Sequence, residues 1–93
     1  SDDTVKSPAE IIAQADTFLN GSPEIVPNHS KALDLYFTAI NLAEKTELDE
    51  LNAYTGIADV YFLGTEDMPC DHAKALEYYQ RALKIARRVK NQQ

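Results

Sequence analysis

The chain has 93 residues, of which 44% are hydrophobic and 26% are charged, a composition that suits one small globular domain. Its net charge of −6 argues against duplex nucleic acid or an anionic membrane surface as the main partner. The sequence has no long apolar run of the kind that predicts a membrane-spanning helix or a signal-peptide core. Because it begins at Ser1 and not at Met, we expect a trimmed or processed piece of a longer protein.

The first half of the chain predicts a flexible segment followed by two helices. Residues 1–6 are polar and are expected to form a flexible N-terminal segment. Ser7 and Glu10 have the spacing of a capping box, which predicts a helix start, and Gly21 predicts the end of that helix. Asn28 is a natural cap for the second helix. The wide apolar stripe of the second helix consists of Ala32, Leu33, Leu35, Tyr36, Ala39, Ile40 and Ala43.

The second half predicts two further helices. Thr46 and Asp49 have capping-box spacing before a third helix, which is expected to end at Gly64. Its apolar positions are Leu51, Tyr54, Ile57, Ala58, Tyr61 and Phe62. Asp71 caps a fourth helix, predicted over residues 72–90, with a stripe of Ala75, Leu76, Tyr79, Ala82, Leu83, Ala86 and Val89. No useful stretch alternates with a period of two, so strands are not expected.

The two halves are copies of each other at a shift of 43 residues, without a gap. Ten residues recur unchanged: Ala15, Asp16, Gly21, His29, Lys31, Ala32, Leu33, Tyr36, Ala39 and Ala43 become Ala58, Asp59, Gly64, His72, Lys74, Ala75, Leu76, Tyr79, Ala82 and Ala86. A fixed period of this length is typical of stacked helical units, which build a surface and not a catalytic cavity. The sequence therefore predicts an all-α fold of two tandem antiparallel helix hairpins. The first repeat is residues 7–46, and the second is 47–93 with an extended C-terminal helix.

The spacing of small and aromatic residues resembles the tetratricopeptide repeat, and more closely its longer Sel1-like relative. In the first helix of each copy a small residue is followed by an aromatic one, as Ala15…Phe18 and Ala58…Tyr61. The second helices carry Ala32…Tyr36…Ala39 and Ala75…Tyr79…Ala82. The Sel1-like features are Tyr61-x-x-Gly64 and Asp71-x-x-Lys74-Ala75, echoed by Phe18-x-x-Gly21 and Asn28-x-x-Lys31-Ala32.

This resemblance covers residues 8–90, with some departures from the pattern. Ile11 and Tyr54 stand at the usual Trp position, the Gly-rich loop of Sel1-like repeats is missing, and no Pro closes the first repeat. The resemblance implies a right-handed superhelical segment that serves as a protein–protein interaction module, a scaffold or adaptor. The alternative is a structural assembly segment. Two repeats are fewer than a solenoid usually needs, so we expect self-association or neighbouring repeats in a longer array.

The resemblance also implies that the first helix of each hairpin lines the concave binding surface. The expected residues are Ala9, Ile12, Asp16 and Leu19 in the first copy and Asn52, Thr55, Asp59 and Phe62 in the second. Since Asp16 and Asp59 supply one carboxylate per repeat, we hypothesise an acidic, partly apolar groove for a basic or helical peptide. The alternative is that both aspartates are solvated or pair with a lysine of a neighbouring helix. An acidic wall also argues against a clamp for a terminal carboxylate.

The recurring histidines, His29 and His72, each follow a helix cap and stand alone, so we interpret them as polar first-turn residues and not as metal ligands. The lone Cys70 can form neither an internal disulfide nor a metal cluster, which favours a reducing compartment such as the cytoplasm. Tyr78 and Tyr79 are interpreted as packing residues and not as a base-stacking platform. Since the sequence has no catalytic constellation and no phosphate-binding loop, we predict a protein that is not an enzyme and needs no cofactor or metal.

The charges are divided unevenly along the chain. Residues 1–50 carry ten acidic side chains against three basic ones, whereas residues 51–93 carry five against six. The basic side chains of the last helix are Arg81, Lys84, Arg87, Arg88 and Lys90. They complement the negative end of the helix dipole, and the alternative is an acidic partner such as the first half of another copy.

Overall fold

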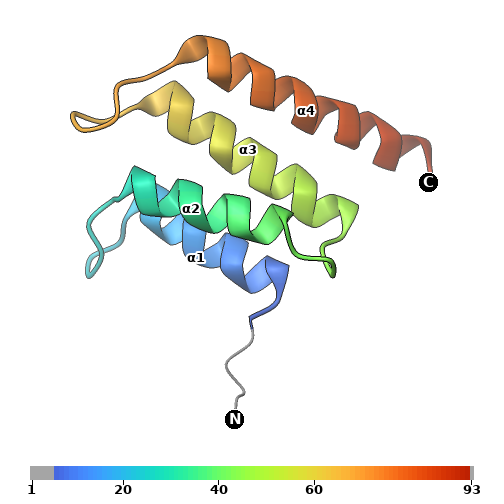
Figure 1. Ribbon diagram of the computed structural model, residues 1–93, viewed down its shortest axis with the longest axis horizontal. Coiled ribbons are helices and arrows are strands. Elements are labelled where there is room, and N and C mark those ends of the chain that lie inside the picture. The colour runs from blue at the N-terminus through green and yellow to red at the C-terminus, as the bar shows by residue number, and fades with distance from the viewer. Residues whose placement is uncertain (1–5, 93) are drawn as a thin grey trace.

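A computed structural model describes residues 6–92 as four helices. They are α1 (Pro8–Asn20), α2 (His29–Ile40), α3 (Glu47–Leu63) and α4 (His72–Asn91), as Figure 1 shows. The helices pair as α1 with α2 and α3 with α4, so the prediction of an all-α fold with two hairpins is confirmed. Apart from Lys6, the segment predicted to be flexible lies outside the described residues.

The helices begin where local hydrogen bonds cap them. The amide of Glu10 donates to the Ser7 hydroxyl at 3.2 Å, and the amide of Ser7 donates to the Glu10 carboxylate at 2.8 Å. Thr46 and Asp49 form the same reciprocal box at the start of α3. Both predicted capping boxes are therefore present, and they satisfy amides that a helix start leaves without partners.

The 43-residue repeat of the sequence is also a repeat of contacts. Gly21 and Gly64 end α1 and α3 with φ angles of 77° and 66°, in the region where glycine is favoured. The amide of Asn28 donates to the carbonyl of Phe18 at 2.7 Å, and its copy, from Asp71 to Tyr61, measures 2.8 Å. The two hairpins therefore close in the same way, and residues 43 apart can be compared as equivalent positions.

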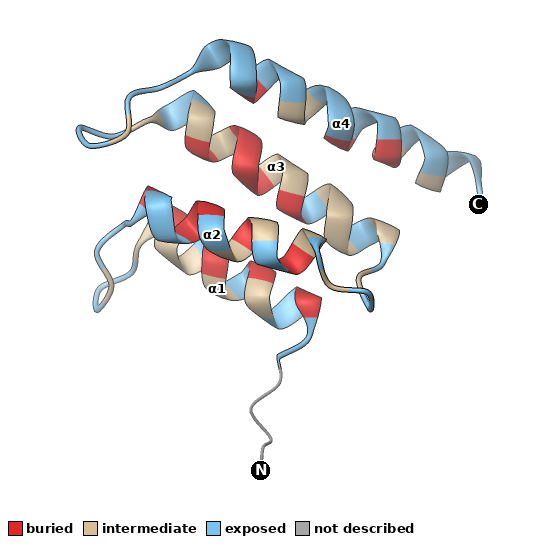
Figure 2. Ribbon diagram, in the orientation of Figure 1, coloured by how far each residue is buried: buried red, intermediate tan, exposed pale blue. Residues whose placement is uncertain are grey.

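The third helix is the centre of the domain. It packs on α4 within its own hairpin and on both α1 and α2 of the first hairpin, and Figure 2 shows buried residues along most of its length. Its buried residues are Ala53, Gly56, Ile57, Ala58 and Val60. The predicted stripe omitted Ala53, Gly56 and Val60, because a single amphipathic face was expected. A helix with neighbours on three sides is instead apolar around most of its surface.

The fourth helix is buried on one side only. Ala75, Ala82 and Ile85 are buried, whereas Leu76 and Leu83 are 58% and 49% exposed. Most of α4 is accordingly exposed in Figure 2. The prediction that these two leucines belong to the core is wrong, because among the described helices only α3 packs on α4.

Candidate protein-binding surface

The two repeated aspartates accept hydrogen bonds from tyrosines of the same hairpin. The Tyr36 hydroxyl donates to Asp16 Oδ1, and the Tyr79 hydroxyl donates to Asp59 Oδ1 at 2.5 Å. Each pair joins the first helix of a hairpin to the second across 20 positions of sequence. Neither alternative of the sequence analysis, solvation or a lysine partner, included this arrangement. The hydrogen bonds from Tyr36 and Tyr79 give the two carboxylates a structural role, because each bond links the two helices of one hairpin.

The pKa values of both tyrosines are raised by their surroundings. Burial, followed by the hydrogen bond to Asp59, raises the pKa of Tyr79 to about 12. Burial and the hydrogen bond to Asp16 raise the pKa of Tyr36 further in the same direction. Both hydroxyls therefore remain protonated donors at neutral pH, which keeps each ring in a fixed position beside its aspartate.

The other residues predicted to line a concave surface do not lie together on one exposed face. Ile12 and Leu19 are only 5% and 8% exposed and belong to the core cluster, so neither is available to a partner. Thr55 is half-buried and donates its hydroxyl to the carbonyl of Leu51 at 2.8 Å. Ala9, Asp16, Asn52 and Phe62 are exposed, and Asp59 is half-buried. Ile12 and Leu19 are buried because both α2 and α3 pack on α1.

A different set of side chains forms an apolar surface at the end of the second hairpin. We call it the open face, and it consists of Phe62, His72, Ala75, Leu76, Tyr79 and Leu83. The first five line a shallow hollow of about 280 Å³, and Leu83 continues the stripe of Leu76 and Tyr79 at helical spacing. Phe62 is 52% exposed, and its ring stacks on that of His72 with centroids 5.2 Å apart.

The first hairpin buries its copy of this face. Most equivalents of the open-face residues are fully or nearly fully buried: Leu19, His29, Ala32, Leu33 and Tyr36, while Ile40 is half-buried. The difference lies in α3, which packs on α2 and has no counterpart on α4 among the described helices. Leu76 and Leu83 were predicted as part of the apolar stripe of the fourth helix and were not among the predicted binding residues. The signal was present in the repeat, because a recurring residue that packs on the next hairpin in the first repeat is exposed in the second unless a further helix covers it.

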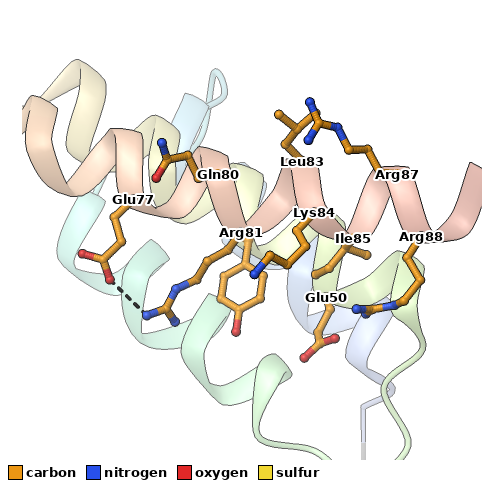
Figure 3. A pocket seen from close by; sticks show the side chains of 10 residues that line it. Glu50, Glu77, Gln80, Arg81, Leu83, Lys84, Ile85, Arg87 and Arg88 are labelled. Atoms are coloured by element: carbon orange, nitrogen blue, oxygen red, sulfur yellow. Dashed lines mark hydrogen bonds and ion pairs between the residues drawn. The ribbon is translucent and has the colours of Figure 1, made fainter.

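A second hollow, of about 790 Å³, lies along α4 and is lined also by Glu50 and Tyr54 of α3; Figure 3 shows its side chains. Its α4 lining is Glu77, Gln80, Arg81, Leu83, Lys84, Ile85, Arg87 and Arg88. Arg81 pairs with Glu77 at 3.0 Å and lies over the rings of Tyr54 and Tyr78. Two of the five predicted basic residues therefore have intramolecular partners, since Arg88 also pairs with Glu47 at 3.3 Å.

The two recurring histidines have different surroundings. His29 is 7% exposed at the start of α2, and His72 is exposed and stacked on Phe62. Within residues 6–92, no group of three His, Cys, Asp or Glu side chains could hold a metal ion. None of the described helices is long and apolar enough to cross a membrane.

Comparison with known proteins adds no relative. No protein family model, no curated protein and no solved structure matches the chain.

Proposed function

We propose that this chain is a protein–protein interaction module, a scaffold or adaptor made of two tetratricopeptide-like or Sel1-like hairpins stacked as a right-handed superhelical segment. The support for stacking is that α3, the first helix of the second hairpin, packs on both helices of the first. The matching caps and Asp–Tyr pairs of the two hairpins agree with a repeat architecture. In such architectures binding surfaces extend over several helices.

The observation that carries this proposal is the open face. Phe62, Leu76 and Leu83 are between 49% and 58% exposed and all belong to this one face of the second hairpin. Grouped apolar side chains of this size mark an interaction surface more often than single exposed leucines do. Of the predicted binding residues, the open face keeps Phe62 and does not include Ile12 or Leu19.

Affinity capture with a matched pair of variants tests the proposal. The bait is the 93-residue chain, compared with Leu76→Asp and Leu48→Asp. The two leucines are both 58% exposed, but Leu48 lies in the first turn of α3, away from the open face. We expect a protein that the parent chain and Leu48→Asp both retain and that Leu76→Asp loses. Capture of the same proteins by all three chains would contradict the proposed surface.

A structural assembly segment is the second candidate, and the same exposed stripe favours it. Two copies that paired their open faces would bury Leu76 and Leu83 against each other. Sedimentation velocity over a wide range of concentration separates the two functions. A dimer that Leu76→Asp abolishes, in the absence of any other protein, would favour assembly over adaptor binding.

A further inference from the structure

The repeat indicates what kind of molecule covers the open face. Every residue of that face has a copy 43 positions earlier, and α3 covers this copy in the first hairpin. Leu33 and Tyr36 are 9% and 0% exposed there, whereas Leu76 is 58% exposed and Tyr79 is half-buried. The side of α3 that packs on α2 therefore shows the chemistry that fits the open face.

That side of α3 has a defined pattern. Gly56 contacts the ring of Tyr36, and Ala53, Ile57 and Val60 belong to the same core cluster as the buried residues of α2. These four positions follow the spacing i, i+3, i+4 and i+7, so they share one helix face. A Cβ placed on Gly56 would overlap Cζ and Cε1 of Tyr36. The helix over Tyr36 must therefore carry a very small residue at the crossing point.

The ring of Tyr79 imposes the same requirement on the open face. Its hydroxyl donates to Asp59 just as that of Tyr36 donates to Asp16, so the two rings have the same anchor. Leu76 and Leu83 lie one turn before and one turn after it on α4. A matching helix would place a small residue over Tyr79 and branched apolar residues beside the two leucines.

The first helix of a second copy does not meet this requirement. The α1 residues equivalent to Ala53, Gly56, Ile57 and Val60 are Glu10, Ala13, Gln14 and Thr17. All four are exposed or half-buried, and three of them are polar. Head-to-tail stacking through α1 would bury these polar groups against leucines, and the Cβ of Ala13 would overlap the Tyr79 ring. This side of α1 is a polar end face of the kind that terminates a repeat array.

The geometry of α4 also argues against a following helix of the same chain in the α3 position. After α2 ends at Ile40, six residues turn the chain into α3. The equivalent of Ile40 is Leu83, yet α4 continues for eight more residues to Asn91, about 12 Å farther along the axis. Ile85 is buried on this extension and Arg88 pairs with Glu47, so the extension is held against α3. The six-residue turn that follows Ile40 therefore has no equivalent directly after Leu83.

We propose that the open face binds an amphipathic helix of another protein that reproduces the α2-facing pattern of α3, with a small residue over Tyr79. This inference rests on the proposed function and specifies the partner: apolar, helical, and small at its centre. The helix would pack on α4 as α3 packs on α2, the arrangement of these two helices that Figure 1 shows. A partner helix with a bulky residue at its central position would clash with the ring of Tyr79. Tyr79 is therefore the residue that determines specificity.

A peptide with the sequence Glu47–Leu63 is the probe, crosslinked on the side opposite Gly56 to hold it helical. The matched control peptide carries Gly56→Leu. Each is titrated into the full chain, and amide chemical shifts and affinity are recorded. We expect shifts around Leu76, Tyr79 and Leu83, and affinity weakened about tenfold or more by the control substitution. Leu76→Asp in the chain should abolish binding, while Leu48→Asp should retain it.

Three results would overturn the inference. They are equal affinity of the two peptides, shifts confined to Leu33 and Tyr36 through replacement of the resident α3, and dimerisation of the free chain through Leu76. Lack of peptide binding tests the partner chemistry, whereas the capture experiment tests the proposed function. If Leu76→Asp loses a captured protein but the α3 peptide does not bind, the proposed function stands and the proposed partner chemistry is wrong.

Discussion

Gly56 lies where α3 crosses the ring of Tyr36, and Gly56→Ala should destabilise the domain even though alanine favours helices. In an ordinary helix interior this change stabilises by about 0.5–1 kcal/mol. Here the new methyl group would lie 2.6 Å from the Tyr36 hydroxyl oxygen and closer still to two ring carbons. The ring is fully buried and bonded to Asp16, so it cannot move aside without cost.

Overpacking of this kind costs about 1–3 kcal/mol, so we expect a net loss of roughly 1 kcal/mol in the free energy of unfolding. The assay is urea denaturation followed by circular dichroism. Ala13 occupies the equivalent position in α1 and is exposed, so Ala13→Gly reports the propensity cost alone, about 1 kcal/mol. In a Tyr36→Leu background, which removes the overlapping atoms, Gly56→Ala should become neutral or stabilising. A Gly56→Ala chain more stable than the parent would refute the packing described at this crossing.

Three further results are expected from the same denaturation assay. Tyr36→Phe should cost about 1–2 kcal/mol, and Tyr79→Phe less, because the Tyr36 side chain is fully buried and that of Tyr79 is half-buried; equal losses would contradict this ranking. Since the folded pKa of Tyr79 is about 12, above its ordinary value of 10.0, its stabilisation is complete below pH 10.0 and is lost as the pH rises through about 12. Tyr79→Phe should therefore reduce the alkaline loss, and an unchanged pH dependence would argue against the Asp59 bond. Arg88→Ala should cost less than about 1 kcal/mol and only at low salt, because both it and Glu47 are over one-third exposed; a larger, salt-independent loss would show that the pair matters more.

The ends of the helices were predictable from the sequence because they depend on neighbouring residues. Ser7 and Thr46 carry their partners three positions later, and Gly21 and Gly64 supply the backbone conformation that ends each first helix. A local signal of this kind does not depend on the tertiary fold. The same reasoning explains why Asn28, as a cap, was also identified correctly.

The buried sides of α3 and α4 were predicted less well, because they depend on which other helices are present. Leu33 and Leu76 are identical residues at equivalent positions, yet one is buried and the other exposed. The structural role of Asp16 was also missed, since its partner Tyr36 is 20 positions away. The recurrence of the same Asp–Tyr spacing at Asp59 was the signal in the sequence that could have revealed it.

The second hairpin leaves uncovered the surface that the first hairpin buries against α3. Hydroxyl-radical footprinting with mass spectrometry measures this directly, by comparing oxidation of Leu76 with Leu33 and of Phe62 with Leu19. In the free chain we expect Leu76 and Phe62 to oxidise readily and their copies to be protected; with a bound partner helix, all four should be protected. Protection of Leu76 in the free monomer, or its undiminished oxidation in the complex, would contradict the account.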